Sequence, residues 1–169
     1  MYVFSLKELY LHDLRELLDF ERQKALFLCD APGSISLDRL LSAMQACSKQ
    51  TPAYSERLEA ILCRHGASRH PAMQRASMTV LTVAEQGLFS MGDPELYDAV
   101  LVTFLRRTTH HELAACRCAM ARAETLMLGL DRHSLLDIFT EKTAADAELE
   151  SIEAEVNQLA LMVSTPAYV

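Results

Sequence analysis

Residues 101–126, LVTFLRRTTHHELAACRCAMARAETL, predict one long helix with a carboxylate on its apolar face. Small and apolar side chains recur there at alternating spacings of four and three, the pattern of a helix that packs in a bundle. The positions on this face are Leu101, Leu105, Thr108, Glu112, Ala115 and Ala119. Glu112 must therefore be paired, metal-bound or protonated, because an isolated buried charge is very costly.

The composition favours a single helical domain. The chain has 169 residues, half of them apolar, with 5 Gly, 5 Pro and no Trp. This length is sufficient for a real hydrophobic core, and the apolar fraction argues against disorder. The net charge is −7, and no block of Lys and Arg marks a nucleic-acid surface. We therefore expect no nucleic-acid partner.

The five cysteines and the start of the chain point to a reducing compartment. The number of cysteines is odd, and Lys7, Glu8, His12 and Asp13 occur where a signal peptide would be apolar. The longest apolar runs are far shorter than a membrane span. The sequence predicts a cytoplasmic protein with free thiols and no membrane association.

Helical periodicity divides the chain into five segments. Ser5 and Glu8 form a capping box, Ser36 is expected to cap the second segment, and Gly66, Gly92 and Gly129 are expected to end segments. The expected helices cover residues 5–29, 37–65, 71–90, 94–128 and 131–162. The sequence thus predicts an all-α, up-down four-helix bundle with an additional short crossover helix over 71–90. One domain would span 1–163, and 164–169 would form a tail.

Two further charged residues interrupt apolar faces near the middle of a helix. Glu21 does so in the first helix and Lys142 in the last. Because the midpoints of antiparallel helices meet at one level, Glu21, Glu112 and Lys142 are expected to form a buried charge cluster, flanked by Gln50. The alternative is that the assigned faces are rotated by one position, which would leave some of these side chains at the boundary.

A bundle core with several carboxylates can also hold a di-metal centre. The di-iron carboxylate arrangement uses Glu-x-x-His pairs, which do not occur at the required places here, and an ammonium at Lys142 would repel the ions. His110 and His111 diverge by about 100°, so at most one of them can face the core. A metal site would need the last helix to be rotated by one position. Its ligands for iron or manganese would then be Glu21, Glu112, Glu141, Asp146 and His110.

Several motifs together resemble the YciF-like stress proteins, a ferritin-like family. They are LKELYLHDL at 6–14, FERQ at 20–23, ERLE at 56–59 and HHELAA at 110–115. Asp93-Pro94 and Glu141 with Asp146 fit the same register, so that the resemblance covers nearly the whole chain. It implies a ferritin-like four-helix bundle with an extra helix, a homodimer, a link to stress responses and, in some members, a rubrerythrin-like di-metal site.

The resemblance also identifies where this chain departs from the family. Glu21, Glu112 and Glu141 match family carboxylates. Ahead of the threonine of the second helix, the family tends to have His and Glu, whereas this chain has Cys47 and Gln50. On the last two long helices the family tends to have a further Glu each, whereas this chain has Thr109 and Lys142. Gln and Thr are poor di-iron ligands, and protonated Lys is none.

The favoured interpretation is a stress-associated ferritin-like protein with an eroded di-metal site and no cofactor. It would act as a non-catalytic binding or structural protein, without catalytic residues. One alternative is a di-metal oxidoreductase of the peroxidase or oxidase type. A second alternative is an adaptor or inhibitor that binds another protein.

Overall fold

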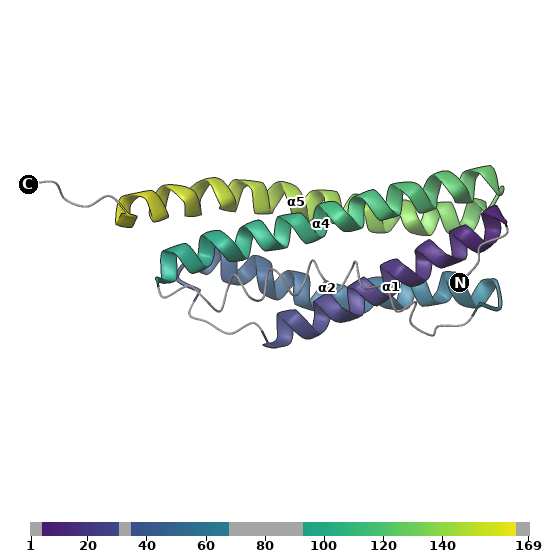
Figure 1. Ribbon diagram of the computed structural model, residues 1–169, viewed down its shortest axis with the longest axis horizontal. Coiled ribbons are helices and arrows are strands. Elements are labelled where there is room, and N and C mark those ends of the chain that lie inside the picture. Colours follow the sequence, from purple (N-terminus) through teal and green to yellow (C-terminus); the bar gives the residue numbers. More distant parts are fainter. Residues whose placement is uncertain (1–4, 31–34, 68–92, 165–169) are drawn as a thin grey trace, which may run out of the picture.

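The computed structural model describes residues 5–30, 35–67 and 93–164 and shows a bundle of long helices (Figure 1). The helices are α1 (Leu6–Asp30), α2 (Asp38–Arg64), α4 (Pro94–Thr125) and α5 (Gly129–Ser164). The prediction of an all-α bundle is confirmed. The crossover helix expected over 71–90 lies outside the described residues. Within the described residues, no helix is long and apolar enough to cross a membrane.

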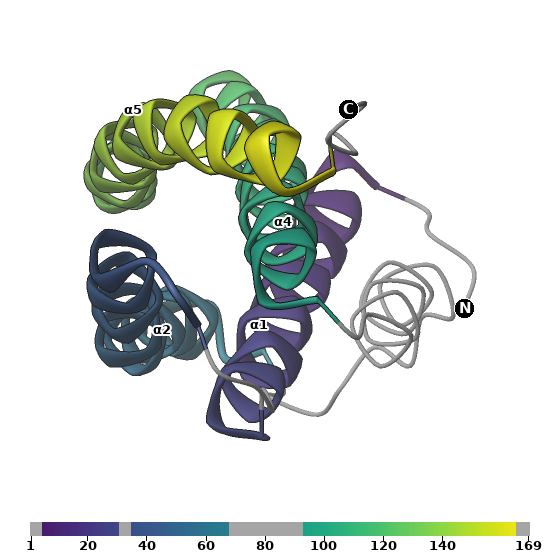
Figure 2. The ribbon, with the colours of Figure 1, turned by 90° about the vertical axis from the view of Figure 1, so that its left-hand side faces the viewer.

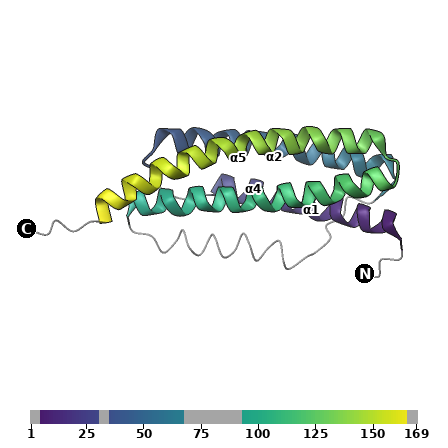
Figure 3. The ribbon, with the colours of Figure 1, turned by 90° about the horizontal axis from the view of Figure 1, so that it is seen from above.

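The helices form two antiparallel pairs, α1 with α2 and α4 with α5. In the end-on view of Figure 2, α4 lies between α1 and α5, and α2 lies across from α4. Contacts accordingly join α1 to α2 and α4, and α5 to α4 and α2. The last turns of α5 extend past the start of α4 (Figures 1 and 3). The four described helices thus surround a common core.

The buried apolar residues form two clusters, one in each half of the bundle. The first contains Tyr10, Leu14, Leu17, Leu18, Tyr54, Leu58, Ile61, Leu62, Cys116, Ala119, Ala123, Leu135 and Ile138. The second contains Phe20, Leu28, Leu40, Tyr97, Leu101, Val102, Phe104, Leu105, Leu149, Ile152 and Val156. Polar residues lie between the clusters in the sequences of α2, α4 and α5, namely Thr51, Glu112 and Lys142, and Glu21 follows Phe20 in α1; all four polar residues are buried. The core is thus divided by a polar level.

The helix starts use two kinds of cap. Ser5 Oγ accepts a hydrogen bond from the Glu8 amide at 3.1 Å, as the capping box predicts. The start of α2 differs from the prediction, because Ser36 is not its cap. Instead Asp98 of α4 accepts hydrogen bonds from the amides of Ser36 and Leu37 and from the Ser36 hydroxyl. A buried carboxylate of α4 therefore holds the two residues that precede α2.

A second buried carboxylate ties the opposite end of the bundle together. Asp131, in the first turn of α5, accepts hydrogen bonds from Tyr10 of α1 at 3.0 Å and from Arg64 of α2 at 2.9 Å. His65 Nε2 lies 2.6 Å from the same carboxylate. Burial would raise the pKa of Asp131, but hydrogen bonds from His65, Arg64 and Tyr10 together lower it. This network joins three helices at one point.

Two helices end in residues with positive φ. Gly66, expected to stop α2, has φ of 60°, and the Ala67 amide bonds to the Leu62 carbonyl, as in a Schellman motif. Gly129 was expected to end α4, and this prediction was wrong, since Gly129 is the first residue of α5. Met127 makes the turn there with φ of 58°. A methionine thus occupies a position that favours glycine.

Replacing Met127 by glycine should stabilise the protein by about 0.5 to 1 kcal/mol, because it removes the left-handed backbone penalty. The Met127 side chain is 92% exposed, so that little packing is lost. Urea unfolding of Met127→Gly and of Met127→Ala would measure this. The alanine variant keeps the penalty and should show no gain; equal stabilities of the two variants would contradict the prediction.

Candidate functional site

Four charged side chains meet in the middle of the bundle and are called here the charged layer. Glu21 and Lys24 come from α1, Glu112 from α4 and Lys142 from α5. Both glutamates are 0% exposed and both lysines are 3% exposed. The layer contains two carboxylates and two ammonium groups, so that its charges balance when all four are ionised.

The charges alternate in sign along a chain of short contacts. Lys24 Nζ donates to both carboxylate oxygens of Glu112, at 3.1 and 2.8 Å. Lys142 Nζ lies 3.0 Å from Glu112 Oε2 and 2.6 Å from Glu21 Oε1. The order is therefore Lys24, Glu112, Lys142, Glu21. Glu112 holds two ammonium groups, whereas Glu21 Oε2 has no hydrogen-bond partner among the described residues.

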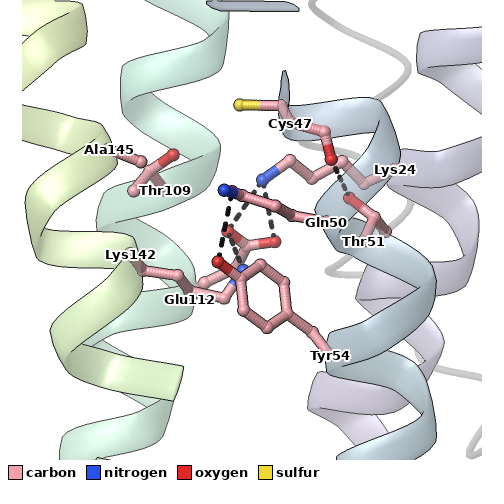
Figure 4. Close-up of a pocket in the computed structure, with 9 residues that line it drawn as sticks. All are labelled: Lys24, Cys47, Gln50, Thr51, Tyr54, Thr109, Glu112, Lys142 and Ala145. Carbon is pink, nitrogen blue, oxygen red and sulfur yellow. Dashed lines mark hydrogen bonds and ion pairs between the residues drawn. The ribbon is translucent and has the colours of Figure 1, made fainter. Parts of the chain in front are cut away.

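Helix α2 completes the site with neutral groups. The Lys142 ammonium lies 4.1 Å from the centre of the Tyr54 ring, a cation–π contact. The Tyr54 hydroxyl donates to Gln50 Oε1 at 3.3 Å. Gln50 was expected in the buried cluster, but it is exposed. It lies at the α2 side of the site, as Figure 4 shows.

A small cavity adjoins the charged layer (Figure 4). Its volume is about 10 Å³, at the lower limit of the space that holds one water molecule. The walls come from all four helices and are Lys24, Cys47, Gln50, Thr51, Tyr54, Thr109, Glu112, Lys142 and Ala145. The cavity is too small for an organic substrate.

The surroundings shift the pKa values of the two glutamates in opposite directions. For Glu112, burial would raise the pKa, but the ammonium groups of Lys24 and Lys142 outweigh it and lower the pKa. For Glu21, burial and the charge of Glu112 raise the pKa to about 7, against the opposing effect of Lys142. Lys142, between the two carboxylates, has a raised pKa in spite of its burial. Glu112 is thus the fixed anion of the layer.

The neighbouring thiols are not activated. Burial raises the pKa of Cys116 to about 12, and burial also raises the pKa of Cys47. Because the thiolate is the nucleophile, a raised pKa makes both thiols poor nucleophiles near neutral pH. The site therefore contains no activated cysteine.

The remaining predicted ligands lie away from the charged layer. Glu141 is exposed and accepts a hydrogen bond from Arg57 at 2.7 Å. His110 is exposed, with Nε2 2.8 Å from Asp146, which also contacts Arg106. The potential metal ligands thus belong to three separate ion-pair groups: Glu21 with Glu112, Glu141 with Arg57, and His110 with Asp146.

Lys24 is the member of the charged layer that was not predicted from the sequence. After Glu21, the predicted apolar face of the first helix continued to Ala25, which repeats a spacing of four. Strict alternation of four and three instead runs through Leu17, Glu21 and Lys24. Continuing that alternation would have placed the second lysine in the core.

We expect the stabilising effect of Glu21 to decrease as the pH rises from 4.5 to about 7. A carboxyl group whose pKa is raised by folding binds more protons in the folded state over this range, so its ionisation favours unfolding. Urea unfolding of the wild type and Glu21→Gln across this range tests the sign. Glu141→Gln removes an exposed carboxylate and is the matched control. An advantage of the wild type over Glu21→Gln that grows with pH would refute the assignment.

Two solved structures have the same fold. YcfI, a candidate structural protein from Rhodopseudomonas palustris, is 22% identical, with a TM-score of 0.83 over 88% of this chain and 94% of that chain. The E. coli stress protein YciF is 19% identical, with a TM-score of 0.80 over 92% of this chain and 99% of that chain. The fold is therefore the ferritin-like helical bundle that the resemblance implied. The comparison with curated protein sequences finds no match.

The family comparison covers almost the whole chain. A family described as a domain of unknown function, DUF892, matches residues 5–161. This range includes the charged layer and all four described helices apart from the end of α5. The chain belongs to the DUF892 family and is of the YciF-like type.

Proposed function

We propose that this protein is a non-catalytic binding or structural protein of the stress response, in which a charged layer replaces the di-metal centre of the ferritin-like fold. The supporting observation is the position of Lys142. Its ammonium group lies within 3.0 Å of both Glu21 and Glu112, the two carboxylates that match family positions. A cation supplied by the chain thus stands between the carboxylates that would bind metal.

The groups around the charged layer do not fit a di-metal centre. Both carboxylate oxygens of Glu112 already bind ammonium groups. Oε1 accepts from Lys24, and Oε2 contacts both Lys24 and Lys142. A divalent ion about 4 Å from an ammonium group would meet a repulsion of about 8 kcal/mol per lysine at an intermediate effective dielectric constant. Among the described residues around Glu112, no ligand set for iron or manganese forms while both lysines remain in the core.

The positions that depart from the family support the same proposal. Cys47, Gln50, Thr109 and Lys142 all line the one small cavity beside Glu112. The Thr109 hydroxyl donates to the Leu105 carbonyl at 2.9 Å and so bonds within its own helix. The four replacements therefore gather at one place in the bundle, as expected if they changed a single site.

The di-metal oxidoreductase is less well supported. It requires Glu141 to face the core and Lys142 to face solvent. The side chain of Glu141 is 44% exposed and that of Lys142 is 3% exposed, the reverse of this requirement. The stress assignment draws on the similarity to the E. coli stress protein YciF.

Metal analysis of the purified protein tests the absence of a di-metal centre. After dialysis we expect far less than one iron or manganese ion per chain, and no peroxidase or ferroxidase turnover after addition of iron. The physical reason is the repulsion between the two lysines and a divalent ion. About two iron or manganese ions per chain that resist dialysis would overturn the proposal.

Replacing Lys142 by methionine should lower the free energy of unfolding by about 3 kcal/mol or more, because it leaves Glu21 without its buried ion-pair partner. Chemical unfolding measures the loss. The control is Arg57→Met, which removes a partly exposed ion pair with Glu141 and should cost less than about 1 kcal/mol.

The double variant Glu21→Gln, Lys142→Met should regain part of this stability, since it removes the stranded carboxylate together with the ammonium group. If Lys142→Met costs no more than Arg57→Met, the charged layer does not stabilise the core and the proposal loses its support.

A further inference from the structure

A second cluster of ionisable groups lies on α1, away from the charged layer. His12, Asp13 and Glu16 each offer one ligand atom, and these atoms all lie within 4.8 Å of one another. Among residues 5–30, 35–67 and 93–164, no other group brings three such ligands so close. We propose that this cluster is a binding site for a divalent transition-metal ion of the zinc type, separate from the centre of the bundle.

The helix itself prepares two of the ligands. His12 and Glu16 are four residues apart, which places both side chains on one face of α1. His12 Nδ1 lies 3.5 Å from Glu16 Oε2. Zinc bonds of about 2.0 to 2.2 Å would place neighbouring ligand atoms about 3.4 Å apart. The distance between His12 Nδ1 and Glu16 Oε2 already matches this spacing.

A positive group already lies at this cluster. Arg122 of α4 already bonds to Asp13 with Nη1. The guanidinium group thus occupies the position of a competing cation. A bound metal ion would displace it and neutralise two partly buried carboxylates more completely.

The donor set suits a zinc-type ion. One imidazole and two carboxylates are ligands that zinc and related ions accept, and water molecules can complete the coordination. Because Arg122 belongs to α4, exchange of its guanidinium group for an ion would alter the contact between α1 and α4.

Titration of zinc into chelator-treated protein by calorimetry tests the site. We expect one zinc ion per chain in the wild type and an affinity lower by roughly tenfold or more in His12→Ala and in Glu16→Gln. The matched control is His133→Ala, because His133 and Asp137 form another i, i+4 pair, at 3.9 Å, that lacks a third ligand. This variant should bind zinc like the wild type.

Arg122→Met provides the decisive comparison. It removes the competing cation, so zinc should bind roughly tenfold more tightly than to the wild type. A wild type that binds no zinc, an equal affinity in His12→Ala and the wild type, or weaker binding in Arg122→Met would each overturn the proposal. Circular dichroism checks that each variant is folded. The result is distinct from the iron and manganese analysis, since the charged layer remains unchanged in all these variants.

Discussion

The binding of two lysine ammonium groups by Glu112 is the constraint on which the rest of the bundle depends. Glu112 is fully buried, and Lys24 and Lys142 reach it from α1 and α5. Desolvated charges of this kind are tolerated only when all partners are in place. A slip of one helix by a heptad, about 10 Å, would move a charge into one of the two apolar clusters. The charged layer thereby fixes the axial register of three helices while the apolar residues supply the bulk of the burial.

The constraint is not shared equally among the helices. Helices α1, α4 and α5 contribute all four charges, whereas α2 faces the layer with neutral groups such as Tyr54 and Thr51. Ion pairs at the bundle surface, including those of Arg39 and Arg57, join α2 to α5 instead. Such exposed pairs contribute little individually and weaken with salt. Helix α2 therefore contributes no charge to the layer and is held instead at its two ends, by Asp98 and by Asp131.

Periodicity alone predicted most of the bundle and three of the four charges. Glu21, Glu112 and Lys142 interrupt regular apolar faces. The interruption is visible in the sequence because the spacing of residues along a helix determines which face each side chain lies on. Lys24 escaped because Ala25 is an equally plausible small core residue. Gln50 was misplaced because a polar residue beside an apolar face can point either way.

The turn at Met127 could not be predicted from the sequence, since methionine does not favour the positive φ that this residue adopts. The hydrogen bonds that hold the residues before α2 were also unpredictable, because their acceptor, Asp98, is distant in sequence.

The position of Asp98 has a consequence for the order in which the chain acquires its structure. The carboxylate that receives the amides of Ser36 and Leu37 is 61 or 62 residues further along the chain. During synthesis from the N-terminus, the start of α2 is exposed before that acceptor exists. The first helical pair therefore completes the start of α2 only when α4 docks, which couples the two pairs during folding.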